Sequence, residues 1–129
     1  MKIAEIEPQG PGIEGAMTNE DFNIVSITDD SFEGEVLKSP IPVLVVFGSE
    51  SSGSTYITLR QIKEAAREYA GKIKIGKVEA AENMVTTKEF RIRQIPTLLF
   101  FKNGLVTGSV TGTVRKREVR TGIRDLLNE

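Results

Sequence analysis

Two uninterrupted apolar runs constrain the fold of this chain more than any other feature. Residues 43–47 read Val-Leu-Val-Val-Phe, and residues 98–101 read Leu-Leu-Phe-Phe directly after Thr97. Neither run alternates polar and apolar side chains, as a strand with one face in water would. Each run therefore predicts a strand buried on both faces, and such strands need helices packed on both sides of their sheet.

Strand and helix patterns alternate around these two runs. Further strands are predicted over residues 23–27, 73–78 and 105–110, and helices over 30–37, from the loop 48–54 to residue 70, and over 84–90 and 114–127. Asn103-Gly104 is typical of a hairpin turn between two antiparallel strands. The order β-α-β-α-β-α-β-β-α predicts an α/β fold with right-handed crossovers, a central mixed sheet and helices on both faces.

The first 22 residues differ in composition from the rest. Pro8–Gly12 disfavours regular structure, and its flanks hold five acidic residues against one lysine. We therefore expect residues 1–22 to be a flexible acidic extension and residues 23–129 to form the folded domain. No run approaches the roughly 18–20 apolar residues of a membrane span, and the acidic N-terminus is unlike a secretory signal, which favours a cytoplasmic protein.

The chain contains no cysteine and no histidine, and this excludes several classes of chemistry. There can be no disulfide, thiolate nucleophile or cysteine-ligated metal, and no serine–histidine pair. We therefore expect no metal and no other cofactor. The net charge of −1 conceals an asymmetry. Residues 1–64 carry four Lys and Arg against eleven Asp and Glu, whereas residues 65–129 carry thirteen against seven.

The segment Ile95–Gly104 resembles the stretch of the thioredoxin family that contains a cis-proline, a central strand and a hairpin turn. Further similarities occur in the same order along the chain, at Thr28–Phe32, Pro42–Val45 with Phe47, Glu68–Lys72, Lys77-Val78 and Gly112. The resemblance covers about residues 23–129 and implies the thioredoxin fold. It also implies that the Ile95–Pro96 peptide bond is cis.

The family's active-site run, Trp-Cys-Gly-Pro-Cys, aligns with Ser51–Thr55. Ser52 and Thr55 stand at the cysteine positions, Gly53 at the glycine and Ser54 at the proline. Gly48 and Ser51 stand at positions where the family has tryptophan, and Arg60 stands at the position of a mid-helix proline. Val46 stands at the position of the family's buried acid. Lys77, which matches a family lysine near that acid, is therefore expected to be a surface lysine. The hydroxyls of Ser52, Ser54 and Thr55 are expected mainly to cap the long helix.

Thiol–disulfide exchange requires one thiolate to attack and a second thiol to resolve the mixed disulfide. The leading expectation is therefore a redox-inactive, thioredoxin-like binding, adaptor or chaperone-like module, and not an enzyme. The alternative is a thiol–disulfide oxidoreductase, a thioredoxin of cell redox homeostasis, whose active-site cysteines were replaced by Ser52 and Thr55.

The resemblance also implies a binding site for an extended peptide. In thioredoxin-like proteins the cis-proline loop lies beside the active motif and pairs with substrate backbone, which here marks Gln94, Ile95, Pro96 and Thr97. The expected partner is thus a protein or extended peptide, with no membrane partner and little support for nucleic acid.

The last helix is loaded with positive charge from its first turn. Its basic residues are Arg115, Lys116, Arg117, Arg120 and Arg124. A solvated face is the simpler interpretation. The functional one, a third alternative, is an electrostatic docking patch for an acidic partner, which could include the acidic N-terminal extension.

Overall fold

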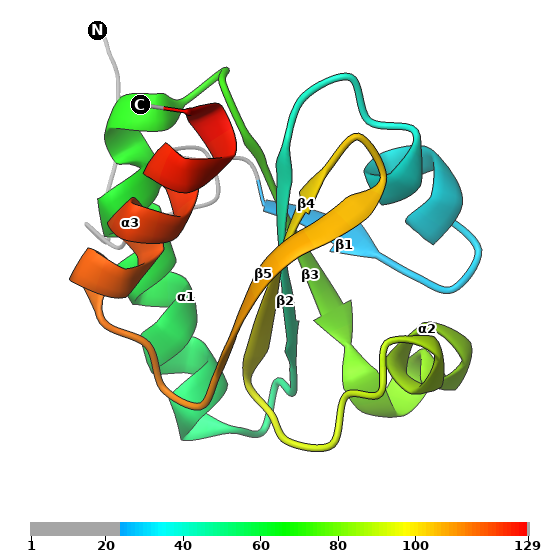
Figure 1. Ribbon diagram of the computed structural model, residues 1–129. Helices are drawn as coiled ribbons and strands as arrows, with labels where there is room; N and C mark the ends of the chain where they lie inside the picture. Colours follow the sequence, from blue (N-terminus) through cyan, green and yellow to red (C-terminus); the bar gives the residue numbers. More distant parts are fainter. Residues whose placement is uncertain (1–23, 129) are drawn as a thin grey trace, which may run out of the picture.

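The computed structural model describes residues 24–128, and the expected extension over residues 1–22 lies outside this range. Figure 1 shows a central sheet with helices on both faces. The strands are β1 (Ile24–Ile27), β2 (Val43–Gly48), β3 (Lys74–Glu79), β4 (Thr97–Lys102) and β5 (Leu105–Thr111). The helices are α1 (Gly53–Ala66), α2 (Met84–Glu89) and α3 (Lys116–Leu127), with shorter turns η1 (Glu33–Leu37), η2 (Arg67–Tyr69) and η3 (Ala80–Glu82).

The sheet has the order β1-β3-β2-β4-β5. β1 and β2 run parallel to β3, and β4 runs antiparallel to β2 and to β5. The expected mixed α/β architecture, the thioredoxin fold, is confirmed, and every residue of β2 is buried. Within residues 24–128, no helix is long and apolar enough to cross a membrane.

Two apolar cores fill the space on either side of the sheet. One joins alternate residues of β2 and β4 to α1 and α3, and includes Leu44, Val46, Phe100 and Ile123. The other joins the intervening strand residues, such as Val45, to η1 and to Phe90 after α2. Val46 is fully buried, so the position of the family's buried acid is part of the core.

The larger differences from the predicted element boundaries occur at three helices. The helix expected at residues 30–37 forms only from Glu33, as a single π-helical turn, because Thr28 first accepts backbone N–H groups of Ser31 and Phe32 in a turn. The long helix changes to a 3₁₀ turn after Ala66. The last helix begins at Lys116 instead of Val114.

Candidate functional site

Three loops meet at one edge of the sheet because the ends of their strands are paired. Phe47 near the end of β2 faces Thr97 at the start of β4, and Thr97 faces Thr111 at the end of β5. Paired strands lie about 4.8 Å apart. The loops after β2, before β4 and after β5 therefore lie side by side, at the lower end of the sheet in Figure 1.

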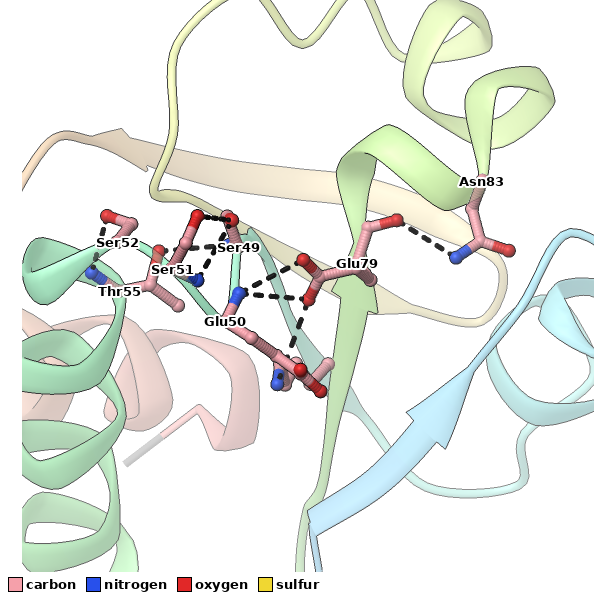
Figure 2. A network of polar contacts seen from close by, with 8 residues as sticks. Ser49, Glu50, Ser51, Ser52, Thr55, Glu79 and Asn83 are labelled. Carbon is pink, nitrogen blue, oxygen red and sulfur yellow. Dashed lines mark hydrogen bonds and ion pairs between the residues drawn. The ribbon is translucent and has the colours of Figure 1, made fainter.

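The turn from β2 into α1 is held by serine and threonine hydroxyls (Figure 2). Ser52 is the N-cap of α1, and its Oγ accepts the backbone N–H of Thr55 at 3.2 Å. Thr55 Oγ1 in turn accepts the N–H of Ser49 at 3.2 Å, and the hydroxyls of Ser49 and Ser51 are 2.9 Å apart. The expected capping role of Ser52 is confirmed. Gly53 and Ser54 form the first exposed residues of the helix.

Thr55 also fills the space beside Gly48. Thr55 is 2% exposed, and a Cβ added to Gly48 would lie 2.4 Å from its Cγ2. A larger side chain at residue 48 is therefore incompatible with this placement of threonine. The two departures from the family pattern at Gly48 and Thr55 are thus linked by direct packing.

The carboxylate of Glu79 anchors the same turn to β3 (Figure 2). It accepts the backbone N–H of Glu50 at 3.0 and 3.2 Å, and Lys77 Nζ lies 3.9 Å from it. Lys77 keeps a quarter of its side chain exposed. The expectation of a surface lysine is consistent with this exposure, and its ion pair with Glu79 was not foreseen.

The loop before β4 is held by backbone and hydroxyl contacts. The Ile95–Pro96 bond is cis, as the resemblance implied. The carbonyl of Pro96 accepts the N–H of Gly112 at 2.8 Å, and Thr97 Oγ1 donates to the carbonyl of Gln94 at 2.6 Å. Gln94 and Ile95 are exposed, whereas Pro96 and Thr97 are buried. The structure therefore places this predicted peptide-binding loop next to the turn that begins α1.

Apolar side chains are exposed on the segments that leave this edge. Tyr56 and Ile57 lie in the first turns of α1, and Tyr56 is 66% exposed. Met84 and Val85 begin α2, and Ile95 precedes the cis-proline. Sequence reasoning singled out Ile95 but not the other four residues, which lie in the first turns of α1 and α2.

Asp29 is a structural residue that sequence reasoning missed. Its carboxylate accepts the N–H groups of Thr86 at 2.9 Å and Val85 at 3.3 Å, and so caps α2 from the turn after β1. The backbone hydrogen bond from Thr86 lowers the pKa of Asp29 below its usual value. Asn83 reinforces the contact by accepting the N–H of Asp29 at 2.9 Å. The partners are 54 to 57 residues apart, so no local pattern reveals them.

One of the five basic residues proposed as a docking patch is engaged in an ion pair. All five are exposed, but Lys116 is paired with Glu64 of α1 at 2.9 Å, and this contact lowers the pKa of Glu64. Arg117 lines a cavity between α3 and β5 instead. Arg115 precedes the helix, and its N–H donates to the Glu118 carboxylate at 2.9 Å. The docking patch stays a prediction. Within residues 24–128, no acidic cluster is arranged to hold a metal ion.

The sequence matches a known protein family over most of its length. The Thioredoxin family model matches residues 23–125. The chain is 39% identical to the thioredoxin of Pseudomonas aeruginosa over 97 residues, which are 75% of this chain and 90% of that protein. It is 41% identical to the thioredoxin of Allochromatium vinosum over 97 residues, covering 75% and 91% of the two chains.

These relatives correct two expectations. A redox-inactive adaptor and a non-enzyme were expected because the cysteines are absent, but relatives about 40% identical over three quarters of the chain are thioredoxins. They give no support to an adaptor or chaperone-like role. They favour the alternative, an oxidoreductase with Ser52 and Thr55 at the cysteine positions. The matched family model and these relatives show that the chain belongs to the thioredoxin family.

Proposed function

We propose that this chain is a thioredoxin, a thiol–disulfide oxidoreductase of protein substrates, whose two active-site cysteines are replaced by Ser52 and Thr55, so that the exchange step itself needs cysteines restored at both positions. The observation that carries the proposal is the position of Ser52. It caps the 14-residue helix α1 at the sheet edge that also carries cis-Pro96, in a chain about 40% identical to thioredoxins. A cytoplasmic location is part of the same proposal.

The side chains at the two replaced positions differ in exposure, and a pair of exchanging thiols needs this difference. Ser52 is partly exposed at the helix N-terminus, whereas Thr55 is buried three residues later. A thiol at residue 52 would be open to a substrate disulfide, and the helix N-terminus would lower its pKa. A thiol at residue 55 would be protected until a mixed disulfide formed at residue 52. Thiol–disulfide exchange requires both thiols. The site therefore needs cysteine in place of Ser52 and Thr55 to turn over.

The surroundings of the site favour an extended protein segment as substrate. Exposed Gln94 and Ile95 precede the cis-proline, and exposed Tyr56 and Ile57 lie on the first turns of α1. Apolar side chains and an accessible backbone segment are the features by which proteins bind extended peptides. The proposed partner is therefore a cysteine-containing segment that lies along Gln94–Thr97.

Restoring the cysteines tests this proposal. We expect Ser52→Cys/Thr55→Cys to accelerate insulin reduction by dithiothreitol well above the rate with either single cysteine, because only the double variant has both an attacking and a resolving thiol. The single variants Ser52→Cys and Thr55→Cys are the matched controls, because each adds a thiol but cannot complete the exchange. The unmodified chain provides the baseline rate.

A folded double variant that reduces insulin no faster than the single variants would contradict the proposal. Circular dichroism and thermal melting establish folding in each case. A separate check uses Ser54→Cys/Thr55→Cys, which has the same number of thiols with the wrong spacing. This variant is expected to stay near the single-variant rate.

A further inference from the structure

A small polar cavity lies directly beside the cis-proline loop. Its volume is about 250 Å³, and it is lined by the loop Phe90–Gln94 together with Thr97, Leu99, Ser109 and Thr111 of β4 and β5. The cavity is continuous with the proposed peptide-binding loop, because Gln94 and Thr97 belong to both. It is smaller than the 300–1,000 Å³ typical of small-molecule pockets, and its size suits a single side chain.

The lining of this cavity is positively charged and rich in hydrogen-bond donors. Arg91 and Arg93 contribute two guanidinium groups, and Ser109 and Thr111 contribute exposed hydroxyls. No aspartate or glutamate lines it. Among the described residues, neither arginine has an ion-pair or hydrogen-bond partner for its side chain. Both charges are therefore available to an incoming anion.

Arg91 directly follows the end of α2 and is positioned by the helix C-terminus. Its φ angle is +55°, the left-handed conformation in which helices commonly end, and its N–H donates to the Lys88 carbonyl at 3.0 Å. The N–H of Ile92 donates to the Thr87 carbonyl at 3.0 Å in the same cap. Phe90, which precedes Arg91, fixes the start of the loop, since its ring packs 5.3 Å from Phe32 and 5.4 Å from Phe101. The two arginines thus project from a loop anchored in the core.

The opposite side of the site has the opposite charge. Glu50 is exposed in the turn before α1, and the Glu79 carboxylate anchors that turn. A peptide lying across the edge therefore meets the exposed Glu50 carboxylate on one side, where Lys77 pairs with Glu79, and guanidinium groups on the other. Planar guanidinium groups bind carboxylates through paired, charge-assisted hydrogen bonds.

We propose that Arg91 and Arg93 select protein substrates carrying an acidic side chain near the reacting cysteine, with its carboxylate in the cavity beside Pro96. This inference rests on the proposed function, because it assigns the substrate class of that same site. The two arginines are specificity residues, not catalytic ones. A free phosphate or acetate ion offers similar chemistry but lacks the peptide backbone that the loop would bind.

The test measures how fast the Ser52→Cys protein forms a mixed disulfide with short peptides. Each peptide has one cysteine that carries thionitrobenzoate as the leaving group. A single Glu, Gln or Lys is placed at one of the three positions before or the three positions after this cysteine. At the favoured position we expect the Glu peptide to react about tenfold faster than the Lys peptide, a typical gain from electrostatic complementarity. Raising the salt concentration should reduce this ratio.

Added Arg91→Gln/Arg93→Gln should bring the Glu-to-Lys ratio within about twofold of one, and Arg91→Glu/Arg93→Glu should invert it. The matched control is Arg60→Gln/Lys63→Gln, which removes two positive charges from α1 and should leave the ratio unchanged. Inversion reports charge at the cavity and cannot arise from a loss of folding. Phosphate or acetate is also added in excess as a competitor. If it slows the Glu and Lys peptides equally, the cavity is not a site for a peptide carboxylate and the proposal is overturned.

The two proposals fail in different ways. If no peptide reacts faster than the thionitrobenzoate derivative of free cysteine, the site does not bind peptides and the proposed function is wrong. If peptides react faster but with the same Glu-to-Lys ratio in the arginine variants as in Ser52→Cys alone, the proposed function stands. In that case the acidic-substrate proposal is overturned.

Discussion

The two halves of the site lie side by side but are held together in different ways. The turn Ser49–Thr55 depends on its own hydroxyls, two of which stand at the positions where the family has cysteines. The loop Gln94–Thr97 is held through the Pro96 carbonyl and a single threonine hydroxyl. In the turn, therefore, the residues at the cysteine positions also form the hydrogen bonds that hold the segment. In the loop, much of the hydrogen bonding comes from the backbone.

The two cysteine positions of the family lie in the turn, so their replacement affects the turn directly. Hydroxyls replace thiols in the turn and form an alternative set of hydrogen bonds there, so the helix start survives. The two hydrogen bonds described for the loop involve neither residue 52 nor residue 55. The following predictions test this contrast, beginning with the largest expected effect.

Gly48→Ala should destabilise the protein by about 1–3 kcal/mol, because its Cβ would overlap the Thr55 side chain at 2.4 Å. The cost should fall in a Thr55→Ala background, which removes Cγ2 and Oγ1. A double-mutant cycle by urea unfolding measures this coupling. Equal costs in both backgrounds would show that Gly48 and Thr55 are not packed together.

Ser52→Ala should cost about 1 kcal/mol of unfolding free energy, because the Thr55 N–H loses its capping acceptor. Ser54→Ala is the matched control, since Ser54 is exposed in the same helical turn and has no side-chain hydrogen bond among the described residues. Its effect should stay within about 0.5 kcal/mol. Comparable losses for both variants would refute a specific cap at Ser52.

The order of strands and helices along the chain was predictable, but the contacts that shape the site were not. Continuous apolar runs such as Val43–Phe47 identify buried strands without further information. The Ser52 cap follows from a local preference. In contrast, the Asp29 cap of α2 joins residues more than 50 positions apart. The packing of Gly48 against Thr55 depends on the angle at which α1 leaves β2, which a sequence pattern does not encode.

Thr58 lies one turn after Thr55 and provides a contrast within α1. Its hydroxyl is fully buried and has no partner among the described residues. Thr58→Val should therefore stabilise the protein by up to about 1 kcal/mol, since an unpaired polar group is replaced by an apolar one of similar shape. Thr55→Val is the counterpart and should destabilise, because it removes the acceptor of the Ser49 N–H. Urea unfolding of both variants compares the two hydroxyls.

Thr97→Val tests the loop half in the same way. It removes the hydroxyl that donates to the Gln94 carbonyl, and we expect a loss of about 0.5–1 kcal/mol because exposed Gln94 can turn to water. Thr111→Val on the facing strand is the matched control, and its effect should be smaller. A loss as large as that of Gly48→Ala would mean that the loop depends on this side chain more than on its backbone contact.

Asp29→Asn tests whether the stability that each half gains from its helix cap depends on pH. α1 is capped by a neutral hydroxyl, whereas α2, which leads into the loop, is capped by the Asp29 carboxylate. Hydrogen bonding from Thr86 lowers the pKa of Asp29 in the folded protein. Its contribution is therefore fully present above the unfolded pKa of about 3.9 and is lost as the pH falls through the lower folded pKa.

The melting temperature of Asp29→Asn should accordingly lie below that of the unmodified protein at pH 7, and the gap should close as the pH falls below about 4. Asp30→Asn is the control, because Asp30 is exposed and has no side-chain contact among the described residues. The gap for Ser52→Ala should stay constant over the same range, since a hydroxyl cap does not titrate there. A pH-independent gap for Asp29→Asn would show that its charge does not cap α2, and the two halves would then differ only in packing.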